Sequence, residues 1–94
     1  ALTLEPADAL SHNNAGLIYL GRNNVWAAGV HFEAAIATDP ANVYALNNLG
    51  VVLERKSRIA EAREMYQRAM DANPDFAPAR NNHKRLAPTA AVGR

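Results

Sequence analysis

Apolar and small residues recur at helical spacing in two neighbouring stretches of the chain. In residues 9–21, His12, Ala15 and Tyr19 fall on one face of a helix. Residues 25–38 carry a second stripe, whose members are Val25, Ala28, Phe32, Ala35 and Ile36. The polar residues 22–24 form a short turn between the stretches, and Pro40 ends the second one, because proline disfavours helical geometry at the residue before it. The pattern predicts a pair of antiparallel helices.

The whole pattern returns 34 residues later, with helices predicted over 43–56 and 59–72 and a turn between them. Asn-Asn pairs begin at positions 13, 47 and 81, and prolines stand at 6, 40 and 74. A fixed period of this length is typical of chains built from stacked copies of one structural unit.

Counted from Ala9 and Val43, the two units resemble the tetratricopeptide repeat. That family expects glycine at the eighth place, alanine at the twentieth and twenty-seventh, an aromatic residue at the twenty-fourth and a closing proline. The chain supplies Gly16, Gly50, Ala28, Ala62, Ala35, Ala69, Phe32, Tyr66, Pro40 and Pro74 at those places. The fourth place departs from the family, since His12 and Leu46 stand where tryptophan is frequent. The resemblance implies an all-α fold, a right-handed α-solenoid of antiparallel helix–turn–helix units.

Glycine inside a helix costs about 1 kcal/mol relative to alanine. That cost is tolerable at Gly16 if the missing side chain lets the second helix approach closely, with Phe32 filling the space between small alanines. We therefore expect the glycine and the aromatic residue of each unit to be packed together.

The repeat frame divides the chain into five parts. Residues 1–8 align with the end of a preceding repeat's second helix and its turn, which suggests a fragment of a longer array. Residues 9–42 and 43–76 are two complete units, 77–87 form a polar, basic capping helix, and 88–94 read as a disordered tail. Such a cap shields the last apolar face of a solenoid from water.

Composition favours binding over catalysis. The net charge of +1 predicts no attraction to nucleic acid, and no apolar run approaches the ~20 residues needed for membrane insertion. There is no cysteine, no glycine-rich phosphate loop and no metal motif, so we expect no cofactor, metal or catalytic residue. The three histidines are far apart in the repeat frame. We expect His12 and His83 to fill packing positions and His31 to be solvated.

The resemblance implies that the first helices line a concave groove, where the family usually binds extended peptides. The groove would present the second, fifth, ninth, twelfth and thirteenth places, flanked by the sixth. In this chain these are Leu10, Asn13, Leu17, Leu20, Tyr44, Asn47, Val51, Glu54, Arg55, Asn81 and Arg85, with Asn14, Asn48 and Asn82 beside them. The predicted partner is a protein or an extended peptide segment.

The repeated asparagines allow two interpretations. A side-chain amide has donors and an acceptor, so a ladder of amides could hold a partner's backbone whatever its side chains. Asparagine at the sixth place, as in residues 47–50, resembles the arrays of O-linked N-acetylglucosamine transferases. Alternatively, the amides bond neighbouring helices or water. The two-carboxylate clamp of chaperone-binding arrays is rejected, because its Lys, Asn, Lys and Arg positions hold Asn13, Leu17, Pro78 and Asn82.

Trp26 and Val30 form a second candidate surface. They are four residues apart on the side of their helix away from Phe32, and the next unit has Ala60 and Glu64 at those places. An exposed tryptophan can anchor a protein interface. The alternative function is therefore an oligomerisation or assembly module, in which copies of the chain associate into a homo-oligomer through this surface or through the open N-terminal end of the stack.

Overall fold

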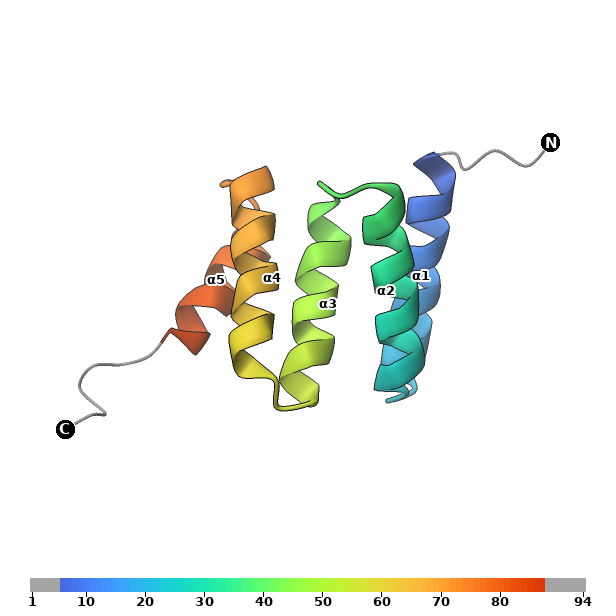
Figure 1. Ribbon diagram of the computed structural model, residues 1–94, viewed down its shortest axis with the longest axis horizontal. Coiled ribbons are helices and arrows are strands. Elements are labelled where there is room, and N and C mark those ends of the chain that lie inside the picture. The colour runs from blue at the N-terminus through green and yellow to red at the C-terminus, as the bar shows by residue number, and fades with distance from the viewer. Residues whose placement is uncertain (1–5, 88–94) are drawn as a thin grey trace.

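The computed structural model describes residues 6–87, and in that range it consists of five helices without a strand. They are α1 (Pro6–Gly21), α2 (Val25–Thr38), α3 (Val43–Arg55), α4 (Ile59–Ala72) and α5 (Ala77–Leu86). Helices that follow one another in the chain pack side by side, so the molecule is an elongated stack (Figure 1). The all-α helical-repeat solenoid expected from the sequence is confirmed.

The helix bounds agree closely with the predicted ones. α2 and α4 have the predicted limits, while α3 and α5 each end one residue early. α1 differs more, because it begins at Pro6 and not at Ala9, so residues 6–8 form its first turn and are not a preceding turn. A proline fits there, since its fixed φ is compatible with the first helical position and its missing N–H has no partner in the helix. The predictions for residues 1–5 and 88–94 lie outside the described residues.

The turn within each unit uses the same backbone geometry. Asn23 and Ser57, at equivalent places, have φ of 62° and 63°, in the left-handed region. Asparagine side chains cap two of the helices. Asn24 Oδ1 accepts from the backbone N–H of Ala27 at the start of α2, and Asn42 Oδ1 accepts from the backbone N–H of Ala45 at the start of α3, after the turn between the units. These caps satisfy N–H groups that a helix leaves without partners.

The core of each unit is the contact between its glycine and its aromatic ring. Phe32 and Tyr66 are completely buried. A Cβ placed on Gly16 would lie 2.7 Å from Phe32 Cδ1, and one placed on Gly50 would lie 2.7 Å from Tyr66 Cζ. The expected close approach is confirmed, and glycine at the eighth place is required by packing.

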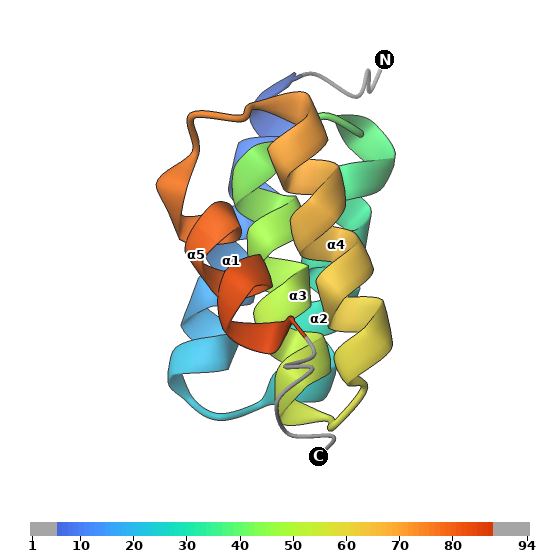
Figure 2. The same cartoon turned by 90° about the vertical axis from the view of Figure 1, so that its left-hand side faces the viewer.

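The first helices converge and the second helices diverge. α3 contacts α1 and α5 as well as α2 and α4, whereas α2 and α4 make no contact with each other. In Figure 2, α1, α3 and α5 lie toward one side and α2 and α4 toward the other. The stack is therefore curved, with α1, α3 and α5 on its inner face. None of the helices described is long and apolar enough to cross a membrane.

Candidate functional site

The inner face is best defined by α3, the middle helix. Because four helices pack around it, its remaining accessible side chains mark the face that is left uncovered. Four of them, Tyr44, Asn48, Val51 and Arg55, are spaced by four, three and four residues along one line of the helix. Tyr44 is 60% exposed and Arg55 is exposed, while Asn48 and Val51 are half-buried. We call these four residues the α3 stripe.

Equivalent stripes continue the inner face onto its two neighbours. On α1 the matching residues Leu10, Asn14 and Leu17 are all exposed, Leu17 by 44% of its surface. On α5 the matching residues are Asn82, half-buried, and Arg85, exposed, and Asn81 beside them is also exposed. The α1 and α3 rows thus place apolar side chains beside amides, and the α5 row adds amides and the guanidinium of Arg85.

The asparagines bond one another across the units. Asn48 Nδ2 donates to Asn13 Oδ1 at 3.0 Å, and Asn82 Nδ2 donates to Asn47 Oδ1 at 3.0 Å. The acceptors Asn13 and Asn47 are only 7% and 9% exposed. The sixth-place amides of α3 and α5 therefore reach back to the fifth-place amides of the preceding helices α1 and α3. Each donated bond uses one of the two N–H groups of its amide.

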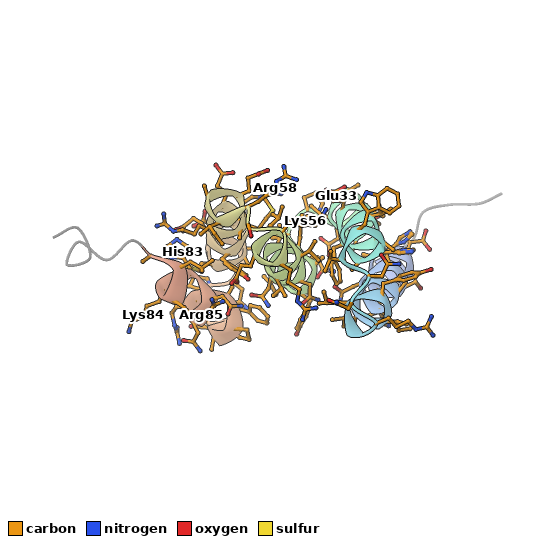
Figure 3. The ribbon with its side chains drawn as sticks, turned by 90° about the horizontal axis from the view of Figure 1, so that it is seen from below. Glu33, Lys56, Arg58, His83, Lys84 and Arg85 are labelled. Carbon is orange, nitrogen blue, oxygen red and sulfur yellow. The ribbon has the colours of Figure 1, made fainter. Side chains whose placement is uncertain are left out.

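A second polar contact joins α5 to α3. Arg85 donates to both carboxylate oxygens of Glu54, at 2.9 and 2.7 Å, and also to Asn82 Oδ1 at 3.2 Å. The hydroxyl of the buried Tyr66 donates to the same carboxylate. Hydrogen bonding from Arg85 lowers the pKa of Glu54, against burial, which raises it. Burial raises the pKa of Tyr66 well above its usual value, so the hydroxyl stays protonated. Arg85 and Lys84 lie on the opposite side of the molecule from Glu33 and Arg58 (Figure 3).

The residues predicted to line the groove do not share one environment. The second-, sixth- and ninth-place residues of α1 and α3, together with Arg55, form the accessible rows described above. The twelfth-place Leu20 and Glu54 are half-buried, Leu20 against the core and Glu54 against Tyr66 and Arg85. The fifth-place Asn13 and Asn47 are buried between units, although Asn81 on α5 is exposed. Arg55 Nη1 approaches Leu20 O and Asn23 Oδ1 at 3.5 Å, so it too reaches toward the preceding unit.

Two expectations for the histidines are wrong. His12 on α1 and His31 on α2 are not far apart, since their Nδ1 atoms lie 3.2 Å from each other. His31 is half-buried rather than solvated, and its ring stacks on Tyr19 with centroids 5.4 Å apart and planes at 12°. The antiparallel turn at 22–24 folds the two helices onto each other. Pairing the two helices across this turn could have predicted that His12 and His31 meet. Alignment by place in the repeat could not, because it compares residues of different units.

The outer face and the N-terminal end also leave apolar groups accessible. Trp26 is 71% and Val30 48% exposed on α2. On α1, Ile18 is 57% exposed, although Val52 at the same place in the second unit is completely buried.

Known proteins resemble this chain through the repeat. Relatives include probable UDP-N-acetylglucosamine–peptide N-acetylglucosaminyltransferases SPINDLY from Solanum lycopersicum and Petunia hybrida, 40% and 42% identical over 48 residues, or 51% of this chain. Cellulose synthase 2 operon protein C from Komagataeibacter xylinus is 36% identical over 70 residues, or 74% of this chain. The chain covers 5% of each of these proteins, so it spans about one twentieth of their length.

The fold has a solved counterpart in the first TPR of Spaghetti (RPAP3) bound to the HSP90 peptide SRMEEVD. The two agree with a TM-score of 0.81 at 18% sequence identity, over 96% of this chain and 70% of that one. A family model described as tetratricopeptide repeat matches residues 13–77, which is most of the chain. The glycine–aromatic core, the 34-residue period and this match together establish that the chain belongs to the tetratricopeptide repeat family.

Proposed function

We propose that the inner face of α1, α3 and α5 binds an extended peptide segment of a protein partner. The observation that carries this proposal is the exposure of large apolar side chains in the stripes, Leu10 and Tyr44 at 60% and Leu17 at 44%. The core of each unit is already complete without them. Aromatic and aliphatic groups that line a curved surface are the usual anchors of peptide recognition.

The amides between these anchors supply the polar part of the proposed site. A peptide in extended conformation presents N–H and C=O groups at regular intervals, and these need partners when water is displaced. Asn14 is exposed, and Asn48 is accessible while using one N–H for its bond to Asn13. In this proposal the sixth-place amides bind peptide backbone, and the bonds between units hold Asn48 and Asn82 in place for that role.

The arginines of the inner face restrict the class of peptide that we expect it to bind. Arg85 is bound on two sides by Glu54 and Asn82, and Arg55 already contacts the preceding unit. The solved structure that this fold resembles holds an HSP90 peptide, but the four clamp positions of this chain hold Asn13, Leu17, Pro78 and Asn82. We therefore propose a partner segment recognised by apolar side chains and backbone, and not by a terminal carboxylate. The proposal assigns this chain no catalytic step.

A selection from a displayed random peptide library, followed by fluorescence anisotropy with the peptides recovered, tests the proposal. Loss of an anchor is expected to weaken binding at least about tenfold in Leu17→Ser and Tyr44→Ser, because hot-spot side chains contribute more than about 1.4 kcal/mol. Trp26→Ser on the outer face is the matched control and should bind normally. Equal binding by all three variants contradicts the proposal.

The amides are tested with the same peptides. Asn14→Ala removes an exposed amide whose loss should leave packing intact, and it should weaken every selected peptide by a similar factor, because backbone recognition ignores side chains. Asn81→Ala, on the exposed end of α5, should have less effect. Weakening that depends on peptide sequence would argue that the amides read side chains.

A second candidate function is assembly through the outer face or the N-terminal end. It is favoured by the exposure of Trp26 and Val30 on α2, and separately by that of Ile18, whose counterpart Val52 is buried by the preceding unit. Sedimentation velocity of the wild-type chain and of two single variants, Trp26→Ser and Ile18→Ser, distinguishes these surfaces. A dimer lost in only one variant identifies the interface, and a monomer at all concentrations removes this candidate.

A further inference from the structure

Two imidazole rings meet where α1 packs against α2. The Nδ1 atoms of His12 and His31 are 3.2 Å apart, the ring centroids are separated by 5.4 Å, and the ring planes are inclined by 33°. Both side chains are half-buried. Tyr19 stacks on His31 and limits the orientations of that ring. Neither histidine belongs to the inner-face stripes, so the pair is independent of the proposed peptide site.

In the metal-free protein this contact is a hydrogen bond when one Nδ1 is protonated and the other is not. One Nδ1 must carry the proton and donate it, while the other must present its lone pair. The two Nδ1 atoms, which come from different helices, thus face each other directly across one small region. A single proton joins the two Nδ1 atoms, and a cation that accepts a lone pair from each nitrogen could take the place of that proton.

We propose that His12 and His31 form a two-histidine binding site for a divalent transition-metal ion of the Ni²⁺, Cu²⁺ and Zn²⁺ class. Imidazole nitrogens bind such ions at about 2.0–2.1 Å, so nitrogens 3.2 Å apart around one ion subtend roughly 100–106°. An ion held in this way lies beside the line that joins the two nitrogens, so each ring turns to direct its lone pair at the ion. That angle lies between the values for square-planar and tetrahedral coordination. Imidazole ligands suit these ions, whereas Mg²⁺ and Ca²⁺ take oxygen ligands.

Water completes the coordination in this proposal. Within residues 6–87 no third histidine or carboxylate joins the pair to make a larger ligand cluster. Half-burial leaves room for solvent at the ion. The stacked Tyr19 ring restrains one ligand from outside, as supporting groups around metal ligands commonly do.

Such an ion would connect two helices that only the folded chain brings together. Binding therefore favours the folded state over the unfolded state by a factor set by the metal concentration relative to its Kd. At about ten times the Kd this factor is about tenfold, or about 1.4 kcal/mol, which raises the Tm of a domain of this size by about 6–11 °C.

The test is thermal unfolding followed by circular dichroism, with NiCl₂ added to the chain after removal of any histidine tag. Wild type should gain the Tm increase given above, and MgCl₂ should give none. His12→Gln and His31→Gln should each weaken the response by more than about tenfold, since even supporting groups contribute 10–100-fold to metal affinity. His83→Gln, on α5, is the matched control and should respond as wild type does.

A response that is equal in all variants, or absent from wild type up to millimolar Ni²⁺, overturns the proposal. Nuclear magnetic resonance of wild type gives a readout that survives if a variant fails to fold. Paramagnetic broadening by Ni²⁺ should be centred on His12, His31 and Tyr19. Broadening centred on His83 or on the N-terminal amine would place the ion elsewhere and refute the site.

Discussion

Gly50 is the position at which the packing of the repeat is tested most sharply. A Cβ there would lie 2.7 Å from Tyr66 Cζ and 2.8 Å from Cδ1, whereas carbon atoms in contact sit about 3.5–4.0 Å apart. Tyr66 is fully buried and its hydroxyl is bonded to Glu54, so the ring cannot move out into solvent. We therefore predict that Gly50→Ala destabilises the fold although alanine is the better helix former.

The size of the stability loss in Gly50→Ala can be estimated by comparison with a second helical glycine. Gly29 also lies inside a helix, but a Cβ there would meet only Val52 Cγ1 at 3.4 Å, an ordinary contact. Both substitutions gain about 1 kcal/mol of helix propensity, so this contribution cancels between the variants. Forcing a methyl group into a packed core costs about 1–3 kcal/mol. Gly50→Ala should therefore be about 1–3 kcal/mol less stable than Gly29→Ala.

Urea unfolding followed by circular dichroism at 222 nm measures this difference, provided that both variants keep the same m value. In a Tyr66→Leu background the difference should shrink, because the ring atoms that the new methyl group would meet are gone. Equal stability of Gly50→Ala and Gly29→Ala would refute the packing argument, as would an undiminished difference in the Tyr66→Leu background.

Three further predictions concern the turns and the bonds between units. Ser57→Gly should stabilise the protein by up to about 1 kcal/mol, because a left-handed backbone costs a residue with a Cβ roughly 1–2 kcal/mol and glycine about 0.5–1 kcal/mol of entropy; an unchanged or lower Tm would contradict this. Because Arg85 lowers the pKa of Glu54 below 4.5, their ion pair stabilises the fold above that pH and is lost as the pH falls through the lowered pKa. Glu54→Gln should thus cost up to about 1 kcal/mol at pH 7, and its gap to wild type in urea unfolding should close in acid; a gap that widens in acid would reverse the assigned sign. Asn47→Ala should cost about 1–3 kcal/mol, since it leaves the N–H of its α5 partner without an acceptor, while Asn81→Ala should stay within about 0.5 kcal/mol; equal losses would show that the bond between units contributes nothing.

The sequence was sufficient to predict the helices and their packing within each unit. Gly16 and Phe32, or Gly50 and Tyr66, stand at fixed places in one unit, and contacts between neighbouring helices follow from helical periodicity and a short turn. The prediction for α1 was wrong at its start because Pro6 was read by analogy with Pro40. A proline can follow the end of a helix or occupy its first position, and the repeat period alone does not distinguish the two.

Contacts between units and across the helix pair were harder to predict. The bond from Asn48 to Asn13 depends on how one unit is displaced and rotated relative to the next, which residue spacing does not specify. As a result the fifth-place amides, predicted to face the groove, are buried at the unit boundary on α1 and α3. The approach of His12 to His31 likewise depends on the register of the antiparallel pair, and not on places in the repeat.

Peptide binding by the inner face can be examined residue by residue, by chemical-shift mapping of the ¹⁵N-labelled chain with a selected peptide. If the peptide binds there, the largest shifts should fall on the α3 stripe, Tyr44, Asn48, Val51 and Arg55, and extend to Leu17. Shifts confined to Trp26 and Val30 on the outer face, with the α3 stripe unchanged, would contradict it.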